Sequence, residues 1–466
     1  MGALTVREDQ GMAETWVGAT AKQIARAVRR GDTSATRVVA DHLDQIRAHD
    51  AELNAFRVLR PAEAAAEAAK VDDQPELSHL PLAGVPIAVK ENTAVAGSAT
   101  WNGSAAASSG IAEADHEVVR RLRGAGAVVV GLTRMPELGL WAVTDDETAV
   151  TRNPWQLDRT PGGSSGGAAA AVAAGLVPIA HCNDGLGSIR IPAACCGLLG
   201  LKPGRGVVPA QMGADDWFGL VEHGMLTTTV ADAAVGFAVL AGRDAVKLTP
   251  PSALKVAVSL RSPVRGITAD TPNREAVDTA AGMMRDAGHA IVGADPAYPS
   301  SLGLRGMATW FAAAWRDAAA AGIDPATLQA RTRRHIALGE WSWRRGYVRE
   351  TDRTDFRERS IAFFTDGGYD VLMTPALATT PPAALDWHSR SWTANMRASM
   401  QYAPFAAPWN IAGLPAMTVP VGVRPDGIPS AVQLVGPPGS ELLLLSIAGQ
   451  LELQAPWQRH APGWPR

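Results

Sequence analysis

The sequence predicts an α/β fold in which α-helices cover a mixed or parallel β-sheet. Short β-rich runs at residues 84–89, 126–132 and 176–181 are separated by stretches that look helical. Two further strand-like runs, at residues 415–421 and 428–435, lie near the C-terminus and are followed by a helix-like run at residues 441–453. Alternation of this kind is typical of a sheet packed against helices.

The N-terminal part, residues 14–70, is predicted to be helical. Apolar positions recur there near the helical period, at Ile24, Ala27 and Val28 and again at Val38, Val39, Leu43 and Ile46. Asp32, Thr33 and Ser34 offer an N-cap between two helices. The longest apolar run, residues 168–180, contains Gly175 and Pro178, and we expect a buried helix followed by a strand.

The middle of the chain, residues 255–370, begins with the strand-like KVAVSL and continues as helix-forming sequence rich in Ala, Arg and Trp. This composition predicts a helical cap region. The turn between the two C-terminal strands falls on Pro425, Asp426 and Gly427. We expect a single domain over 1–466, comprising N-terminal helices (1–70), a core (84–245), a helical insertion (255–370) and a C-terminal part of the sheet (371–466).

Composition and charge exclude several classes of protein. The net charge of −3 provides no basic field for nucleic acid. The first 20 residues show no signal peptide, and no apolar run reaches the roughly 20 residues that a bilayer requires. Cys182, Cys195 and Cys196 are not spaced like a zinc or thioredoxin motif. We expect a cytoplasmic chain without a metal, a cofactor, a nucleic-acid partner or a membrane anchor.

Residues 161–206 differ from the rest because Gly and Ser cluster twice, in GGSSGG at 162–167 and in GLGS at 185–188. Glycine lets a main chain approach a ligand closely, and a Gly-Ser cluster that opens a helix presents free N–H groups to negative charge. A flexible linker would not run into the helix former AAAAVAAG, and a P-loop would need Gly-Lys-Ser or Gly-Lys-Thr. The segment therefore predicts a catalytic site.

This segment resembles the signature of the amidase signature family, in which GGSSGG precedes a serine in the context D-x-x-G-S-I-R-I-P. GVPIAVKEN at 84–92 resembles the lysine segment of that family. Further similar blocks are TRMPELG at 133–139, TRNPW at 151–155, LKPGRG at 201–206, NIAGLPAMTVPVG at 410–422 and PSAVQLVG at 429–436. The resemblance implies the amidase signature fold, a large mixed β-sheet covered on both faces by α-helices.

The resemblance also implies a Ser-Ser-Lys triad, with Ser188 as nucleophile, Ser164 as bridging serine and Lys90 as base, and a cis peptide bond between Gly163 and Ser164. A serine needs a base to remove its proton, and a lysine serves as base only when burial keeps it uncharged. The apolar VPIAV that precedes Lys90 suits such burial.

Main-chain N–H groups around Gly185, Leu186, Gly187 and Ser188 would form the oxyanion hole. Ser165, Asp184 and Arg190 would hold these loops, Asp184 and Arg190 as a partly buried pair or, alternatively, as a surface ion pair. Leu186 stands where the family usually has glycine, and its β-carbon restricts the backbone and reshapes the site.

Leu140, Trp141 and Trp217 are the expected substrate-pocket residues, with ordinary core packing as the alternative role. Trp310, Trp315, Trp341 and Trp343 fall in the predicted cap. Aromatic walls suit an apolar or aryl substrate. A Ser-His-Asp triad using His181 or His223 is a weaker interpretation because the sequence has no G-x-S-x-G elbow. Cys195 and Cys196 are expected to be buried packing residues.

Together these features predict a hydrolase of small apolar or aryl carboxylic amides that works through an acyl-enzyme and needs no cofactor. Hydrolysis of carbamates or of nylon-type oligomer amides is an alternative, because the same tetrahedral chemistry serves either leaving group. The A subunit of a tRNA-dependent amidotransferase and a catalytically inactive binding protein are alternatives of another class. A homodimer is compatible with the sequence.

Overall fold

The computed structural model describes residues 15–466, so residues 1–14, which include most of the segment read for a signal peptide, lie outside the described residues. Eleven strands form one sheet in the order β1-β3-β2-β4-β6-β5-β10-β11-β9-β7-β8. The strands are β1 (Phe56–Leu59), β2 (Pro86–Lys90), β3 (Val128–Thr133), β4 (Ile179–Asp184), β5 (Leu199–Lys202), β6 (Glu222–Thr227), β7 (Lys255–Val258), β8 (Ala290–Gly293), β9 (Val371–Pro375), β10 (Ala416–Val423) and β11 (Pro429–Val435).

The sheet is mixed, as predicted. β2 runs parallel to both β3 and β4, and β7 runs parallel to both β8 and β9. The strands between these two groups, from β4 through β6, β5, β10 and β11 to β9, pair antiparallel. Parallel neighbours end at the same edge of a sheet, so the carboxyl ends of β2 and β4 lie side by side.

Helices cover both faces of the sheet. Successive side chains of a strand point to opposite faces, and on β5 they meet different helices. On β5, Leu199 and Leu201 join the apolar cluster that contains residues of α8, α9 and α15. Gly200 between them faces the other way, where a β-carbon would lie 2.7 Å from that of Ala193 on α6. The helices are α1 (Ala21–Arg30), α2 (Ala35–Leu53), α3 (Pro61–Asp72), α4 (Glu117–Gly124), α5 (Gly166–Ala173), α6 (Arg190–Cys196), α7 (Asp215–Gly219), α8 (Val230–Ala241), α9 (Thr271–Asp286), α10 (Leu302–Ala320), α11 (Ala330–Arg344), α12 (Glu350–Gly367), α13 (Trp392–Tyr402), α14 (Ala407–Ile411) and α15 (Glu441–Gln454).

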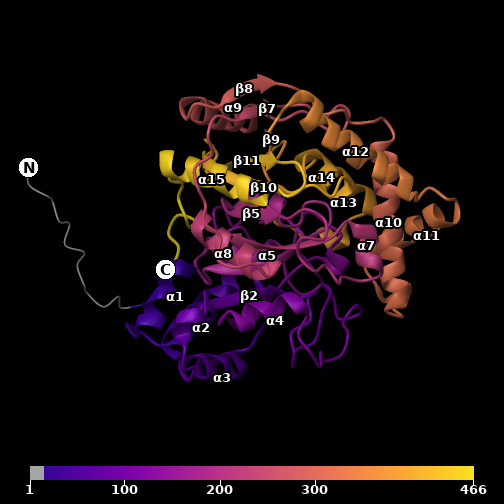
Figure 1. The fold of residues 1–466 in the computed structure, drawn as a ribbon. Helices are drawn as coiled ribbons and strands as arrows, with labels where there is room; N and C mark the ends of the chain where they lie inside the picture. Colours follow the sequence, from indigo (N-terminus) through magenta and orange to yellow (C-terminus); the bar gives the residue numbers. More distant parts are fainter. Residues whose placement is uncertain (1–14) are drawn as a thin grey trace, which may run out of the picture.

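The predicted helical cap corresponds to α10, α11 and α12, which lie together at one side of the molecule (Figure 1). Gly339 of α11 sits against the main chain of α10, where a β-carbon would lie 2.0 Å from the carbonyl oxygen of Phe311. Only glycine allows these two helices to approach so closely. The segment also supplies β7 and β8, which extend the sheet, and α9, which packs against it, so its first part belongs to the core rather than to the cap.

Among residues 15–466, every helix is either too short or too polar to cross a bilayer. The buried helix and strand predicted for residues 168–180 are α5 and the start of β4, and all their residues are buried.

Candidate active site

The candidate site lies where β2 and β4 end beside each other. Lys90 is the last residue of β2, and Asn183 and Asp184 are the last residues of β4. The loop 185–189 then leads from β4 into α6, and Ser164 and Ser165 immediately precede α5. The parallel pairing of β2 with β4 therefore brings residues about 70 to 100 positions apart in the sequence to one edge of the sheet.

Lys90 is fully buried and contacts Ser164 directly, with 2.7 Å between Nζ and Oγ. Its Nζ also lies 2.9 Å from Oδ1 and 3.4 Å from the main-chain oxygen of Asn183. Burial lowers the pKa of Lys90 to about 8, against the opposing effect of the nearby Asp184 and Glu91 carboxylates. The uncharged form of this lysine is thus accessible near neutral pH, although the ammonium still predominates at pH 7.

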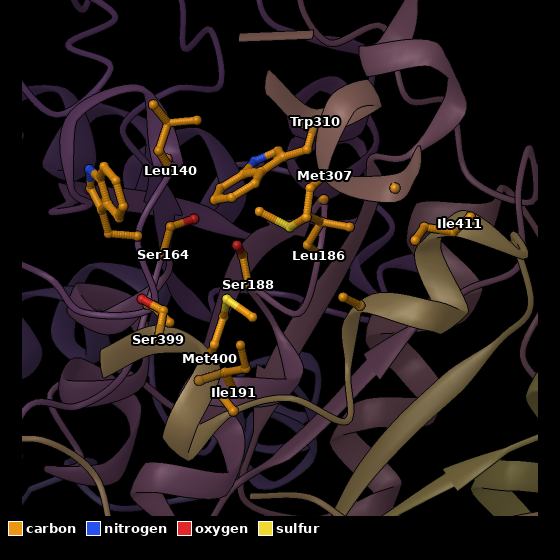
Figure 2. Close-up of a pocket in the computed structure, with 18 of the residues that line it drawn as sticks. Leu140, Ser164, Leu186, Ser188, Ile191, Met307, Trp310, Ser399, Met400 and Ile411 are labelled. Carbon is orange, nitrogen blue, oxygen red and sulfur yellow. The ribbon is translucent and has the colours of Figure 1, made fainter. Parts of the chain in front are cut away.

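Ser164 and Ser188 line the same pocket, and Figure 2 shows both hydroxyls directed into it. No hydrogen bond joins these two hydroxyls in the described chain. The Gly163–Ser164 peptide bond is cis, as the resemblance implies. A β-carbon at position 163 would lie 2.4 Å from the main-chain oxygen of Trp141, so this position accepts only glycine.

The structure corrects one part of the expected oxyanion hole. The N–H of Gly187 donates to Oδ1 of Asp184 at 2.6 Å, and Gly187 is not among the residues lining the pocket. The N–H groups of Leu186 and Ser188 have no acceptor among the described residues, and Gly185, Leu186 and Ser188 all line the pocket. The expected role of Gly187 was wrong because a short hydrogen bond to a carboxylate commits its N–H to holding the loop.

Asp184 and Arg190 form a buried ion pair, so the surface alternative was wrong. Their side chains are 0% and 1% exposed, and Nε of Arg190 lies 3.0 Å from Oδ2 of Asp184. Burial alone would raise the pKa of Asp184, but Arg190 and Lys202 hold it below its ordinary range. Arg190 also donates to Gln433 and Asn410, two residues of the C-terminal part that sequence reasoning did not single out.

These contacts fix the loop that carries Ser188. Besides Gly187, the N–H of Ile189 donates to Asp184, and Asn410 Nδ2 donates to the main-chain oxygen of Asp184 at 2.8 Å. Ser165 is fully buried, and its hydroxyl lies 3.5 Å from the main-chain oxygen of Asn183.

The pocket is a cavity of about 180 Å³ whose wall is largely apolar. The expected Leu140, Trp141 and Trp217 all line it. Sequence reasoning missed most of the remaining wall. Asn92, Leu138 and Ile191 lie close in sequence to the predicted residues, whereas the others come from distant segments: Met212, Val221, Val264, Leu302, Met307, Trp310, Met396, Ser399, Met400 and Ile411. Among the described residues, none that lines this pocket carries a formal charge.

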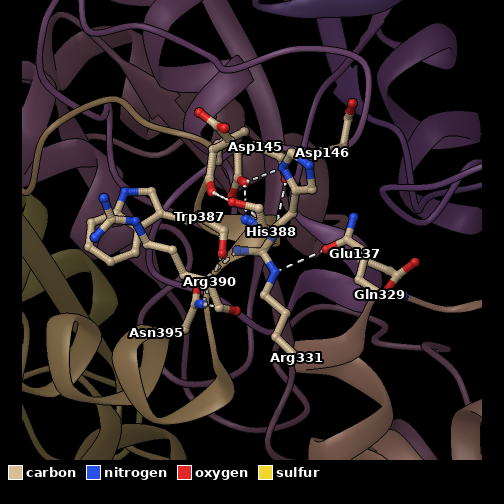
Figure 3. A network of polar contacts seen from close by, with 12 residues as sticks. Glu137, Asp145, Asp146, Gln329, Arg331, Trp387, His388, Arg390 and Asn395 are labelled. Carbon is tan, nitrogen blue, oxygen red and sulfur yellow. Dashed lines mark hydrogen bonds and ion pairs between the residues drawn. The ribbon is translucent and has the colours of Figure 1, made fainter.

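A buried ionic cluster holds the pocket wall against the cap (Figure 3). Arg331 of α11 is 0% exposed and pairs with Asp145 at 3.0 Å, and its guanidinium also donates to Gln329 and Asn395. The same guanidinium lies 5.5 Å from the ring centre of Trp141. Since Leu138–Trp141 and Asp145 belong to one segment, this cluster fixes the pocket wall relative to α11.

The structure gives no support to the histidine alternative. His181 and His223 hydrogen bond to each other at 2.9 Å, and no histidine of the described residues lines the pocket. Cys195 and Cys196 are buried, and burial raises the pKa of both thiols. Residues 15–466 hold no group of three or more His, Cys, Asp or Glu side chains arranged to bind a metal ion.

A family model described as Amidase matches residues 37–445. The chain is 38% identical over 458 residues to the protein named "Putative amidase AmiB2" of Mycobacterium tuberculosis, covering 96% of this chain and 98% of that protein. It is 32% identical over 490 residues to the 6-aminohexanoate-cyclic-dimer hydrolase of Paenarthrobacter ureafaciens, covering 96% and 97%.

Solved structures agree with this similarity. The structure of 6-aminohexanoate cyclic dimer hydrolase with substrate is 28% identical and superposes with a TM-score of 0.85 over 95% of this chain and 98% of that chain. A bacterial aryl acylamidase described as an amidase signature enzyme is 26% identical, with a TM-score of 0.80 over 94% and 96%.

Proposed function

The chain belongs to the amidase signature family and is a hydrolase of C–N bonds other than peptide bonds, and on that premise we propose that it hydrolyses small, uncharged carboxylic amides with apolar or aryl substituents. Ser188, Ser164 and Lys90 are the proposed triad. The observation that carries the proposal is the 2.7 Å contact between the buried Lys90 Nζ and Ser164 Oγ, beside a pocket that also contains Ser188.

In the proposed reaction Ser188 attacks the amide carbonyl while its proton passes through Ser164 to Lys90. The main-chain N–H groups of Leu186 and Ser188, which have no acceptor among the described residues, would bind the developing oxyanion. The amine leaves with the proton returned along the same path, and water then hydrolyses the acyl-enzyme. A hydroxyl can relay in this way because it donates one proton while accepting another.

The uncharged pocket wall supports the choice of substrate. A carboxylate or ammonium group taken from water into this apolar cavity would find no opposite charge on the lining, which makes its burial costly. The same argument weighs against glutamine, which carries both charges, and hence against the amidotransferase alternative. Trp141, Trp217 and Trp310 provide aromatic surface for an aryl or alkyl group.

Hydrolysis of nylon-type cyclic amides is a second candidate, favoured by the similarity to 6-aminohexanoate-cyclic-dimer hydrolase in both sequence and structure. A cyclic amide dimer has no ionised terminus, so it meets the same requirement for an uncharged substrate. Carbamates remain a third, because the proposed chemistry does not distinguish the two leaving groups.

The test combines labelling with a substrate panel. A fluorophosphonate probe is expected to add one covalent adduct to the wild-type protein and none to Ser188→Ala, as read by intact-protein mass spectrometry. Ser109→Ala, which removes an exposed serine, is the matched control and should be labelled fully. An aryl amide, an alkyl amide, a cyclic diamide and an aryl carbamate then rank the candidates by kcat/KM. Wild-type turnover by Ser188→Ala would refute the triad.

A further inference from the structure

An amide pair, Asn183 and Asn92, lies directly behind Lys90. Asn183 is 4% exposed, and its Oδ1 accepts from Lys90 Nζ at 2.9 Å. Its Nδ2 donates to Oδ1 of Asn92 at 2.8 Å. The main-chain oxygen of Asn183 lies 3.4 Å from Nζ, so this one residue presents two oxygens to the lysine.

The number of N–H groups on an uncharged amine determines which of these contacts it can donate to. Such an amine has two N–H groups and one lone pair, and a carbonyl oxygen can only accept a hydrogen bond. Both N–H groups are taken up by the two oxygens of Asn183, so the lone pair faces the remaining and shortest contact, Ser164 Oγ at 2.7 Å.

We infer that Asn183 is a positioning residue that holds the uncharged amine of Lys90 with its lone pair facing Ser164. This inference rests on the proposed function. When the amine takes the proton of Ser164 it becomes an ammonium with three N–H groups, and the third then points at Ser164 Oγ. The same three contacts serve both protonation states, so the proton moves in either direction without movement of a side chain.

Asn92 fixes the orientation that this role requires. If the amide of Asn183 were reversed, its Nδ2 would face Lys90 and set donor against donor. Asn92 Oδ1 accepts from Nδ2 and so keeps Oδ1 on the lysine side. Asn92 also lines the substrate pocket, which connects the lysine to the pocket wall through one amide.

Other titratable groups surround Lys90 without taking this role. Glu91 follows it on β2, His181, Cys182 and Asp184 lie on β4, and His223 lies on β6. None of these side chains forms a hydrogen bond with Nζ in the described chain. Asn183 alone supplies side-chain and main-chain acceptors to the amine among the described residues.

The experiment measures kcat and KM of two Asn183 variants from pH 6 to 10 on one neutral aryl amide. Asn183→Leu removes the Oδ1 acceptor and is expected to lower kcat at least tenfold with KM changed less than threefold. Asn183→Asp places a negative charge against the amine and is expected to move the acid limb of kcat/KM upward by one pH unit or more. Asn54→Asp, at the C-cap of α2 where the amide donates to Val150 and not to the lysine environment, makes the same chemical change and should not move the limb.

Asn92→Ala tests the same inference at a less buried residue, should the variants of the buried Asn183 fail to fold. It is expected to lower kcat three- to tenfold by releasing the amide of Asn183. Unchanged kcat in Asn183→Leu and Asn92→Ala, together with an unmoved limb in Asn183→Asp, would overturn the inference. The proposed function fails separately, through an active Ser188→Ala variant.

Discussion

Burial of Lys90 is expected to make the protein less stable as the pH is lowered from about 10.5 to about 8, and Lys90→Met should remove that dependence. The pKa of Lys90 is lowered from 10.5 to about 8 in the folded protein. In this pH window the lysine binds a proton in the unfolded chain but not in the folded chain. Protonation therefore stabilises the unfolded state, and the free energy of unfolding decreases as the pH falls. Below pH 8 both states bind the proton and the cost is constant.

The magnitude follows from the size of the shift. Each pKa unit is worth about 1.4 kcal/mol, so the full cost near pH 7 is about 3 kcal/mol. At pH 10 most of that cost is absent because the unfolded lysine is itself only partly protonated. The stability of Lys90→Met relative to wild type should therefore be higher at pH 7 than at pH 10 by about 2–3 kcal/mol.

Urea unfolding of both proteins at the two pH values gives this difference directly. Comparing the same pair of proteins at two pH values cancels the pH-independent loss of the hydrogen bonds that Lys90 makes to Ser164 and Asn183. Lys70→Met, on the exposed side of α3, is the matched control and should behave alike at both pH values. Equal differences at pH 7 and pH 10 for Lys90→Met would refute the claim that burial perturbs this lysine.

Three further results are expected. The kcat/KM for a neutral amide should fall about tenfold per pH unit below the Lys90 pKa of about 8, and a flat profile between pH 6 and 8 would contradict a lysine base. Asp184→Asn should lower the free energy of unfolding by about 3–5 kcal/mol in urea titrations, because Arg190 stays buried without its partner; a loss under 1 kcal/mol would disagree. Leu186→Gly removes a side chain from the pocket and should raise the ratio of kcat/KM for bulky acyl groups to kcat/KM for small acyl groups about tenfold, which corresponds to about 1.4 kcal/mol. An unchanged ratio would place Leu186 outside the acyl subsite.

The elements that were predicted correctly are those with strong local signals. β2, β3, β4, β10 and β11 lie within two or three residues of the predicted runs, and α15 matches its predicted range closely. Each contains or adjoins an apolar run of the local sequence. β5 and β6 were not predicted. They include Lys202, Glu222 and His223, whose burial depends on partners distant in sequence.

In the candidate site, too, the residues with a local sequence pattern could be predicted and those brought together by packing could not. Positions 90, 164 and 188 could be proposed from short motifs, because β2, the start of α5 and the loop after β4 carry a local pattern. Apart from Leu140, Trp141 and Trp217, the pocket wall could not, since Trp310 comes from α10 and Ser399 from α13, and only the packing of these helices brings them to Ser188. The N–H of Gly187 was misassigned because its hydrogen bond to Asp184 depends on the three-dimensional path of one loop.

The lowered pKa of Lys90 and the preference for an uncharged substrate have one physical cause. Surroundings that solvate an ammonium at position 90 poorly also solvate a charged substrate beside Ser188 poorly, since both penalties arise from the loss of water. A substrate that fills the cavity also displaces water from the wall that Asn92 shares with the lysine environment. If the chain acts as proposed, binding of a neutral amide would thus favour the uncharged form of Lys90, whereas an anionic substrate would favour the ammonium. Under the proposed function, selection for neutral amides and activation of the serine are therefore coupled through the same burial.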